Sequence, residues 1–103
     1  MALRYILAID GGGTKVLAEL KEQASGATFH AQAGSASISN DLDLALENIV
    51  KVTRDVCQQS GAEPSEIVTV MGIAGGSSQS LAEQFKVMLK LVYEIEFASL
   101  QIT

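Results

Sequence analysis

The residues best suited to chemistry stand together near the start of the sequence, directly after an apolar run at residues 5–9. A carboxylate is followed by three glycines, a hydroxyl and a cation: Asp10, Gly11, Gly12, Gly13, Thr14 and Lys15. Glycines have no Cβ to keep a ligand away and can adopt a positive φ, so their N–H groups can converge on an anion. A carboxylate would repel phosphate, and Asp10 is therefore expected to hold a hydrated metal ion. The stretch predicts a site for a metal-bound polyphosphate.

The residues around this stretch indicate a β-hairpin, because Val16, Ala18 and Leu20 alternate after it and no helix start intervenes. A Walker A loop is excluded, since Lys15 follows Thr14 and leads into a strand. A dinucleotide-binding fingerprint is excluded because the third glycine and the helix are missing. The alternative is a plain tight hairpin, for which two permissive residues would be enough. The neighbouring carboxylate, hydroxyl and cation favour phosphate binding.

Length and charge narrow the class of protein. The chain has 103 residues and a net charge of −5, which indicate one domain and argue against nucleic acid as a partner. Cys57 is the single cysteine, so an internal disulfide or a cysteine metal site is excluded. No apolar stretch approaches the roughly 20 residues of a membrane span, and residues 1–4 run straight into the first strand without a signal peptide. We expect a cytoplasmic protein with no membrane partner.

The remaining pattern predicts alternating strands and helices. Residues 27–33 alternate as a third strand with His30 on its surface, and residues 41–60 form an amphipathic helix that ends at Gly61. Residues 67–71 are apolar on both faces, which is typical of a central parallel strand. A capping box at residues 80–83 should start a second helix, and residues 94–103 should form the last strand. The expected buried face of that helix comprises Leu81, Phe85, Met88, Leu89 and Val92.

This β-β-β-α-β-α-β order predicts an α/β fold with a mixed five-stranded sheet in the order 3-2-1-4-5. Right-handed crossovers that advance in one direction place both helices on the same face. The central strands are nevertheless apolar on both sides, so the second face also expects cover. We therefore predict that a final helix is missing.

Two loops complete the candidate site. Residues 34–40 lead into the first helix, where Asn40 could serve as its N-cap. The central strand stops at a glycine-rich loop, and Gly75 and Gly76 could let a substrate approach the backbone at the carboxyl end of the sheet. The alternative is that these glycines only permit a tight strand-to-helix connection. Because this loop and the hairpin turn should open at the same edge, a role in lining a cleft is favoured.

Residues 9–15, 34–40 and 71–76, taken in this order, resemble the N-acetylglucosamine and glucosamine kinases grouped with the BadF/BadG/BcrA/BcrD ATPases. These enzymes are part of the sugar kinase/heat-shock-protein/actin superfamily. The resemblance implies that residues 1–103 are the N-terminal, ribonuclease H-like part of an actin-like ATPase lobe, truncated and without the second lobe. It also implies ATP and Mg²⁺ as cofactors and an amino sugar as substrate.

The resemblance also assigns roles to individual positions. The turn from Gly11 to Lys15 would hold the β- and γ-phosphates of ATP, and Asp10 would position Mg²⁺ through water. Asn40 matches the position that contacts the sugar hydroxyls, a role it could combine with capping. The aspartate that acts as general base would follow Thr103. The chain would then contain no catalytic residue, and we expect it to be inert alone.

Three other functions stay open. An ATPase that activates a radical dehydratase would need cysteines for an iron–sulfur cluster, which Cys57 alone does not supply. A ROK-type hexose kinase shares the first motif, although residues 72–76 fit the N-acetylglucosamine kinases better. A non-catalytic binding or assembly module would use its uncovered sheet face as an interface. For the amino-sugar kinase we expect a homodimer, formed through the uncovered face or through the last strand.

Overall fold

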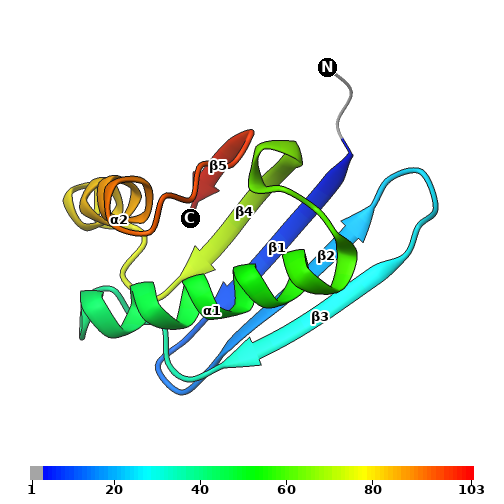
Figure 1. The fold of residues 1–103 in the computed structure, drawn as a ribbon. Coiled ribbons are helices and arrows are strands. Elements are labelled where there is room, and N and C mark those ends of the chain that lie inside the picture. The colour runs from blue at the N-terminus through cyan, green and yellow to red at the C-terminus, as the bar shows by residue number, and fades with distance from the viewer. Residues whose placement is uncertain (1–3) are drawn as a thin grey trace.

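The computed structural model describes residues 4–103, and its elements occur in the predicted order (Figure 1). The strands and helices are β1 (Tyr5–Gly11), β2 (Val16–Glu22), β3 (Thr28–Ala33), α1 (Leu42–Ser60), the short 3-10 helix η1 (Pro64–Glu66), β4 (Ile67–Ile73), α2 (Gln79–Leu91) and β5 (Ser99–Ile102). The expectation that residues 1–3 lead directly into the first strand lies outside the described residues.

The five strands form one sheet in the order β3-β2-β1-β4-β5, so the predicted strand order is confirmed. β1 pairs antiparallel with β2, and β2 pairs antiparallel with β3. On its other side β1 pairs parallel with β4, and β4 pairs parallel with β5. Gly11 at the end of β1 lies opposite Ile73 at the end of β4. The carboxyl ends of the two central strands therefore meet at one edge.

The two faces of the sheet differ in burial. In β1, β2 and β4, alternate side chains are buried in a single core, to which both helices contribute. Figure 1 shows α1 in front of the strands, with α2 beside β4 and β5. The other face carries Ile6, Leu17 and Val70, which are 37%, 42% and 41% exposed. Both helices thus cover one face, as predicted, and the second face is open; a further helix on it stays a prediction.

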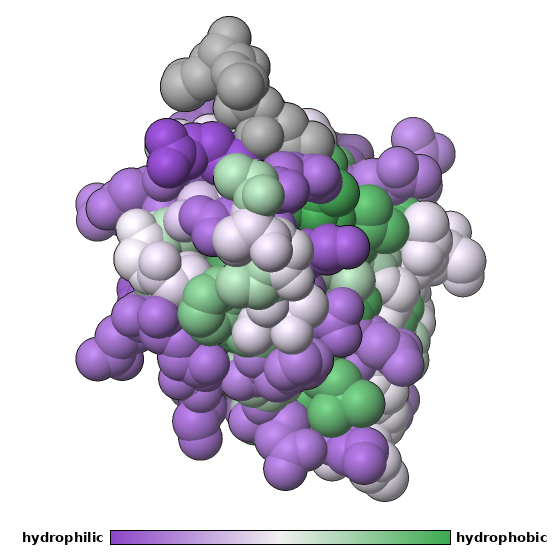
Figure 2. Space-filling view, turned by 90° about the vertical axis from the view of Figure 1, so that its right-hand side faces the viewer, coloured by the Kyte–Doolittle hydropathy of each residue, from purple (hydrophilic) through white to green (hydrophobic). Residues whose placement is uncertain are grey.

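The molecular surface mixes polar and apolar residues. Seen from the side of β2 and β3, hydrophobic residues reach the surface in patches between hydrophilic ones, most visibly toward the upper right (Figure 2). Within residues 4–103, neither helix has the length and hydrophobicity needed to cross a membrane.

The ends of α1 are set by two residues. Asp41 Oδ1 accepts a hydrogen bond of 3.0 Å from the N–H of Leu44, and Asp41 is therefore the N-cap. Gly61 adopts a φ of 78° and donates its N–H to the Cys57 carbonyl, which ends the helix as predicted. The hypothesis that Asn40 caps α1 is wrong, because the next residue supplies the capping oxygen.

Three expectations for the last third of the chain are wrong. The cap of α2 is Ser78, which accepts from the Leu81 N–H at 3.4 Å, and the predicted box at residues 80–83 lies inside the helix. The helix ends at Leu91, so Val92 is 61% exposed instead of buried. β5 has only four residues, because the chain turns at Glu94, where φ is 58°, and becomes a strand five residues later.

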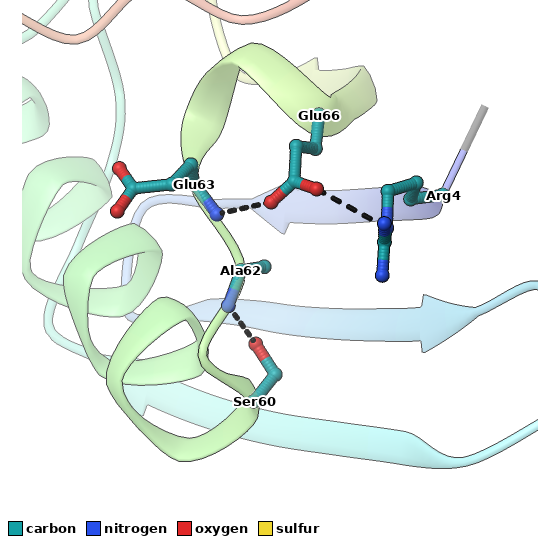
Figure 3. Close-up of polar contacts among 5 residues, drawn as sticks. All are labelled: Arg4, Ser60, Ala62, Glu63 and Glu66. Atoms are coloured by element: carbon teal, nitrogen blue, oxygen red, sulfur yellow. Dashed lines mark hydrogen bonds and ion pairs between the residues drawn. The ribbon is translucent and has the colours of Figure 1, made fainter. Parts of the chain in front are cut away.

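Polar contacts fix the connection between α1 and β4 (Figure 3). The Ser60 hydroxyl accepts from the Ala62 N–H at 3.1 Å just after the helix. One carboxylate oxygen of Glu66 accepts from the Glu63 N–H at 3.1 Å, and the other pairs with Arg4 Nε at 3.1 Å. These contacts tie the start of β4 to the start of β1. The register that brings their carboxyl ends together is thereby supported at the opposite end of the sheet.

Candidate functional site

The structure brings the three sequence motifs together at the carboxyl edge of β1 and β4. The Ala36 N–H donates to the Gly12 carbonyl at 2.8 Å, and the Ala74 N–H donates to the Gly11 carbonyl at 2.9 Å. The Ile38 N–H donates to the Ala74 carbonyl at 2.9 Å, and an isolated parallel bridge joins the same two loops. The hairpin turn, the loop at residues 34–40 and the loop after β4 are therefore adjacent through backbone bonds.

Gly11 has a packing role at this edge. A Cβ built on it would lie 2.6 Å from Ile73 Cγ2 and 2.9 Å from Ala36 Cβ, and the residue is buried at the end of β1. The absence of a side chain at this position is required by the contact between β1, β4 and the loop at residues 34–40. This glycine, predicted to bind phosphate, lies below the turn and not at its tip.

The tip of the turn carries unused hydrogen-bond donors. The Gly12 N–H donates to the Lys15 carbonyl at 2.9 Å and closes the turn. Within residues 4–103, the N–H groups of Gly13, Thr14 and Lys15 donate to no protein acceptor, and the Lys15 ammonium forms no ion pair. A Cβ on Gly13 would meet no atom within 4 Å. Three N–H groups without a protein acceptor, a hydroxyl and a cation therefore belong to consecutive exposed residues, a set of groups that fits phosphate oxygens.

The three glycines of the turn do not use left-handed backbone angles. Among residues 4–103, the glycines with positive φ are Gly26, Gly61 and Gly75. The lack of a Cβ, and not conformational freedom, is therefore what glycine provides between residues 11 and 13: close packing at the first position and access at the last.

Asp10 lies on the open face of the sheet, opposite Leu17 on one side and Gly72 on the other. It lines a shallow hollow of about 570 Å³ together with Glu19 and His30. In the described part of the chain, its carboxylate makes no hydrogen bond and no group of three ligating side chains could enclose a metal ion. Mg²⁺ usually keeps several waters and binds one or two carboxylates plus phosphates, so a lone carboxylate fits that ion.

His30 is a surface residue, as predicted. Its Nε2 lies 3.0 Å from Glu19 Oε1, and both side chains are more than half exposed. An exposed pair of this kind contributes little to stability and shows no feature of a catalytic dyad.

Asn40 ends the second loop with a free side chain. Its N–H donates to Ser37 Oγ at 3.3 Å, and Ser37 Oγ lies 3.2 Å from Ser39 Oγ. The Asn40 amide group is exposed and makes no hydrogen bond within residues 4–103. Because Asp41 caps the helix, the side chain of Asn40 has no structural task and is available for a ligand.

Gly75 and Gly76 both pack against backbone. Gly75 has a φ of 89°, and a Cβ on it would lie 2.7 Å from the Ser39 nitrogen. A Cβ on Gly76 would lie 2.6 Å from the Thr103 carbonyl oxygen, at the end of β5. Neither position faces open space as Gly13 does. The sequence reasoning also missed the role of Ala36 and Ala74, which join the loops of the site through their backbone N–H groups. Backbone contacts of this kind leave no signal in residue type.

Cys57 is a half-buried residue of α1. Burial, and to a lesser extent the nearby Glu63 carboxylate, raises the pKa of its thiol. The thiolate is the form that ligates metals, so this position is unfavourable for a cluster ligand.

Comparisons with known proteins give the relatives of the chain. No protein-family model matches the sequence. Glucosamine kinase GspK of Vibrio cholerae serotype O1 is 30% identical over 82 residues, which are 78% of this chain and 28% of that protein. A proposed N-acetylglucosamine kinase from Chromobacterium violaceum superimposes with a TM-score of 0.78 at 22% identity, over 98% of this chain and 35% of that one. EutJ, an ethanolamine utilization protein from Carboxydothermus hydrogenoformans, superimposes with a TM-score of 0.65 at 16% identity, over 99% of this chain and 38% of that one.

These matches confirm the predicted fold class, an α/β lobe of the ribonuclease H-like, actin-like ATPase type. The chain spans about a third of the length of the relatives it matches, between 28% and 38%. In sequence and in fold it is similar to the N-acetylglucosamine and glucosamine kinases, and the resemblance predicted from the three motifs is confirmed.

Proposed function

We propose that this chain supplies the phosphate-binding turn and part of the sugar-binding surface of an ATP-dependent amino-sugar kinase. The observation that carries the proposal is the meeting of three motifs at one edge, where the turn N–H groups and the Asn40 side chain have no partner within residues 4–103. The similarity to a glucosamine kinase supports the substrate class. N-acetylglucosamine and glucosamine are the proposed sugars.

The residues at this edge of the sheet would have separate roles. Bound Mg·ATP supplies the transferable phosphoryl group and part of the compensating charge. The N–H groups of Gly13, Thr14 and Lys15 would bind phosphate oxygens, and the Lys15 ammonium would stabilise their negative charge. Asp10 would hold Mg²⁺ through its water ligands, and Asn40 would orient the sugar by its hydroxyls. Catalysis would consist of positioning and charge stabilisation.

No residue of this chain is proposed to take the proton from the sugar hydroxyl. We propose that the aspartate acting as general base and the second half of the nucleotide site are not among residues 1–103. We therefore propose that the 103-residue chain binds Mg·ATP weakly and transfers no phosphate. Incubation with Mg·ATP and glucosamine, followed by ³¹P NMR, should yield no sugar phosphate; its formation would contradict the proposed inertness.

Phosphate binding is tested by titrating the ¹⁵N-labelled chain with Mg·ATP up to millimolar concentration. The amide signals of Gly13, Thr14 and Lys15 should shift, and Lys15→Ala should weaken the response. Lys21→Ala is the matched control, because Lys21 is also an exposed lysine of the hairpin but lies away from the turn. Unchanged turn signals in the unmodified chain, or equal losses in the two variants, would refute the proposed role of the turn.

The other predicted partners have separate tests. A homodimer through the open sheet face or β5 stays a prediction, and light scattering coupled to size-exclusion chromatography measures it directly. The radical-dehydratase activator is less favoured, because Cys57 is the single cysteine of the 103 residues and is half-buried in α1. The exposed residues Ile6, Leu17 and Val70 are those whose substitution should change self-association if the open face is the interface.

A further inference from the structure

We infer that the backbone contacts beneath the site hold its loops in position, and that the placement of Asn40 depends on Gly75. The inference rests on the proposed function and extends it to the relation between the two binding segments. We call Gly11, Gly12, Ala36, Ile38 and Ala74 the loop junction. It lies between the turn proposed to bind phosphates and Asn40, which is proposed to bind the sugar.

Ala74 is the centre of the loop junction. Its N–H donates to the Gly11 carbonyl and its own carbonyl accepts from the Ile38 N–H, both at 2.9 Å. A single residue thus connects the strand before the turn to the loop that ends at Asn40. Ala36 closes the arrangement through its 2.8 Å bond to the Gly12 carbonyl. Ala36 and Ile38 are 0% and 2% exposed, whereas Ala74 itself is exposed, so the buried side of the junction is the loop at residues 34–40.

Gly75 allows the second loop to reach this position. A Cβ at residue 75 would lie 2.7 Å from the Ser39 nitrogen, 2.9 Å from Ser39 Cβ and 3.0 Å from Ile38 Cγ1. Two of these atoms belong to the residue immediately before Asn40. A side chain at position 75 must therefore displace the backbone that carries Asn40, since its three nearest atoms belong to Ser39 and Ile38 and not to residues 13–15. The substitution should therefore affect the loop at residues 34–40, which ends at Asn40, and not the turn at residues 11–15.

A matched control separates this contact from backbone strain. Gly75 has a φ of 89°, so Gly75→Ala adds left-handed strain as well as the contact with Ser39. Gly26, in the β2–β3 turn, has a φ of 75°, and a Cβ built on it meets nothing within 4 Å. Gly26→Ala therefore introduces the same kind of strain without the contact.

The first measurement is amide hydrogen exchange by NMR on the full 103-residue chain. In the unmodified protein, the amides of Ala36, Ile38 and Ala74 should be protected. In Gly75→Ala, the Ile38 amide should exchange about 5-fold to 150-fold faster, the range expected for overpacking a buried contact. In Gly26→Ala, the three amides should exchange as in the unmodified protein.

The second measurement distinguishes positioning from general destabilisation. Titration of Gly75→Ala with Mg·ATP should still shift the amides of Gly13 and Lys15. Titration with N-acetylglucosamine or glucosamine should no longer shift the amide and side-chain signals of Asn40, which it should shift in the unmodified protein and in Gly26→Ala. A merely structural role of Gly75 would weaken both responses together or neither.

The outcomes are decisive in both directions. Unprotected Ile38 and Ala74 amides in the unmodified chain would overturn the inference, even if Gly75→Ala failed to fold. Equal exchange in the two variants, or an Asn40 response that survives in Gly75→Ala, would also overturn it. If the unmodified chain responded to neither Mg·ATP nor sugar while the exchange results held, the proposed function would fail and the loop junction would stand as a structural feature alone.

Discussion

Replacing Thr69 by valine should stabilise this protein. Thr69 lies in the middle of β4, is 1% exposed, and its hydroxyl has no hydrogen-bond partner within residues 4–103. Valine has nearly the same shape and suits a strand equally well, so the substitution replaces the unpaired hydroxyl by a methyl group without leaving a cavity. Because β4 connects the core to the glycine-rich loop of the site, its stability also supports the candidate site.

The size of the effect follows from the burial of one hydroxyl. A buried polar group without a partner costs about 1–3 kcal/mol, and an added buried methyl group contributes about 0.8 kcal/mol. Neither the removed hydroxyl penalty nor the methyl contribution is expected in full. Thr69→Val should therefore raise the free energy of unfolding by about 1–2 kcal/mol. Each kcal/mol should raise the melting temperature of a domain of this size by about 4–8 °C.

Thr53 provides the matched control. It is also 1% exposed, but its hydroxyl donates to the Ile49 carbonyl at 2.8 Å within α1. Thr53→Val loses that bond, worth about 0.5–1.5 kcal/mol, and gains a methyl group, so its stability should change little or fall. Urea unfolding followed by circular dichroism measures both variants. An unchanged or reduced unfolding free energy for Thr69→Val, or an equal rise in both variants, would refute the reasoning.

Three further predictions concern the edge of the sheet and the core. Gly11→Ala should lower the free energy of unfolding by about 1–3 kcal/mol through its contact with neighbouring side chains, whereas Gly13→Ala should change it by less than about 0.5 kcal/mol; similar thermal unfolding of the two variants would contradict the packing role. Asp41→Ala should cost about 0.5–2 kcal/mol as a lost cap, and Asn40→Ala should leave stability unchanged but abolish the response to amino sugar; the opposite ranking in denaturant unfolding would make Asn40 the cap. Burial raises the pKa of Tyr5 above its value in the unfolded chain, so its contribution to stability is complete below about pH 10 and is lost as pH rises through the folded-state pKa. Tyr5→Phe should reduce this alkaline loss, and an identical pH profile for the two proteins would show that Tyr5 does not cause it.

The sequence predicts the elements whose periodicity is strong. The alternation of β1 and β2 and the apolar face of α1 each extend over several turns or residue pairs, and the structure agrees with them. The region after α2 was less predictable, because Ile95 and Phe97 alternate with polar residues as in a strand although they belong to a loop. Their side chains are buried or half-buried because this loop packs on the core. A loop that packs in this way can show the same alternation as a strand.

The individual roles of the site glycines also could not be predicted from the sequence. Composition shows that glycine is required at a position but not whether a ligand or a distant part of the chain requires it. Gly11 packs on Ile73 and Gly75 packs on Ser39, contacts that only the folded chain creates. The choice between Asn40 and Asp41 as cap likewise depends on backbone direction, because both residue types favour that position.

The bonds of the loop junction join parts of the chain that are far apart in sequence: Gly11 precedes Ala74 by more than half of the chain. Closing such a long loop costs conformational entropy, and this cost is offset only by the contacts that form when β4 pairs with β1. During synthesis, the turn at residues 11–15 and the loop at residues 34–40 therefore cannot take their final positions until β4 has left the ribosome. The protein should therefore assemble the edge that carries the candidate site late, in the same step that completes its central strand pairing.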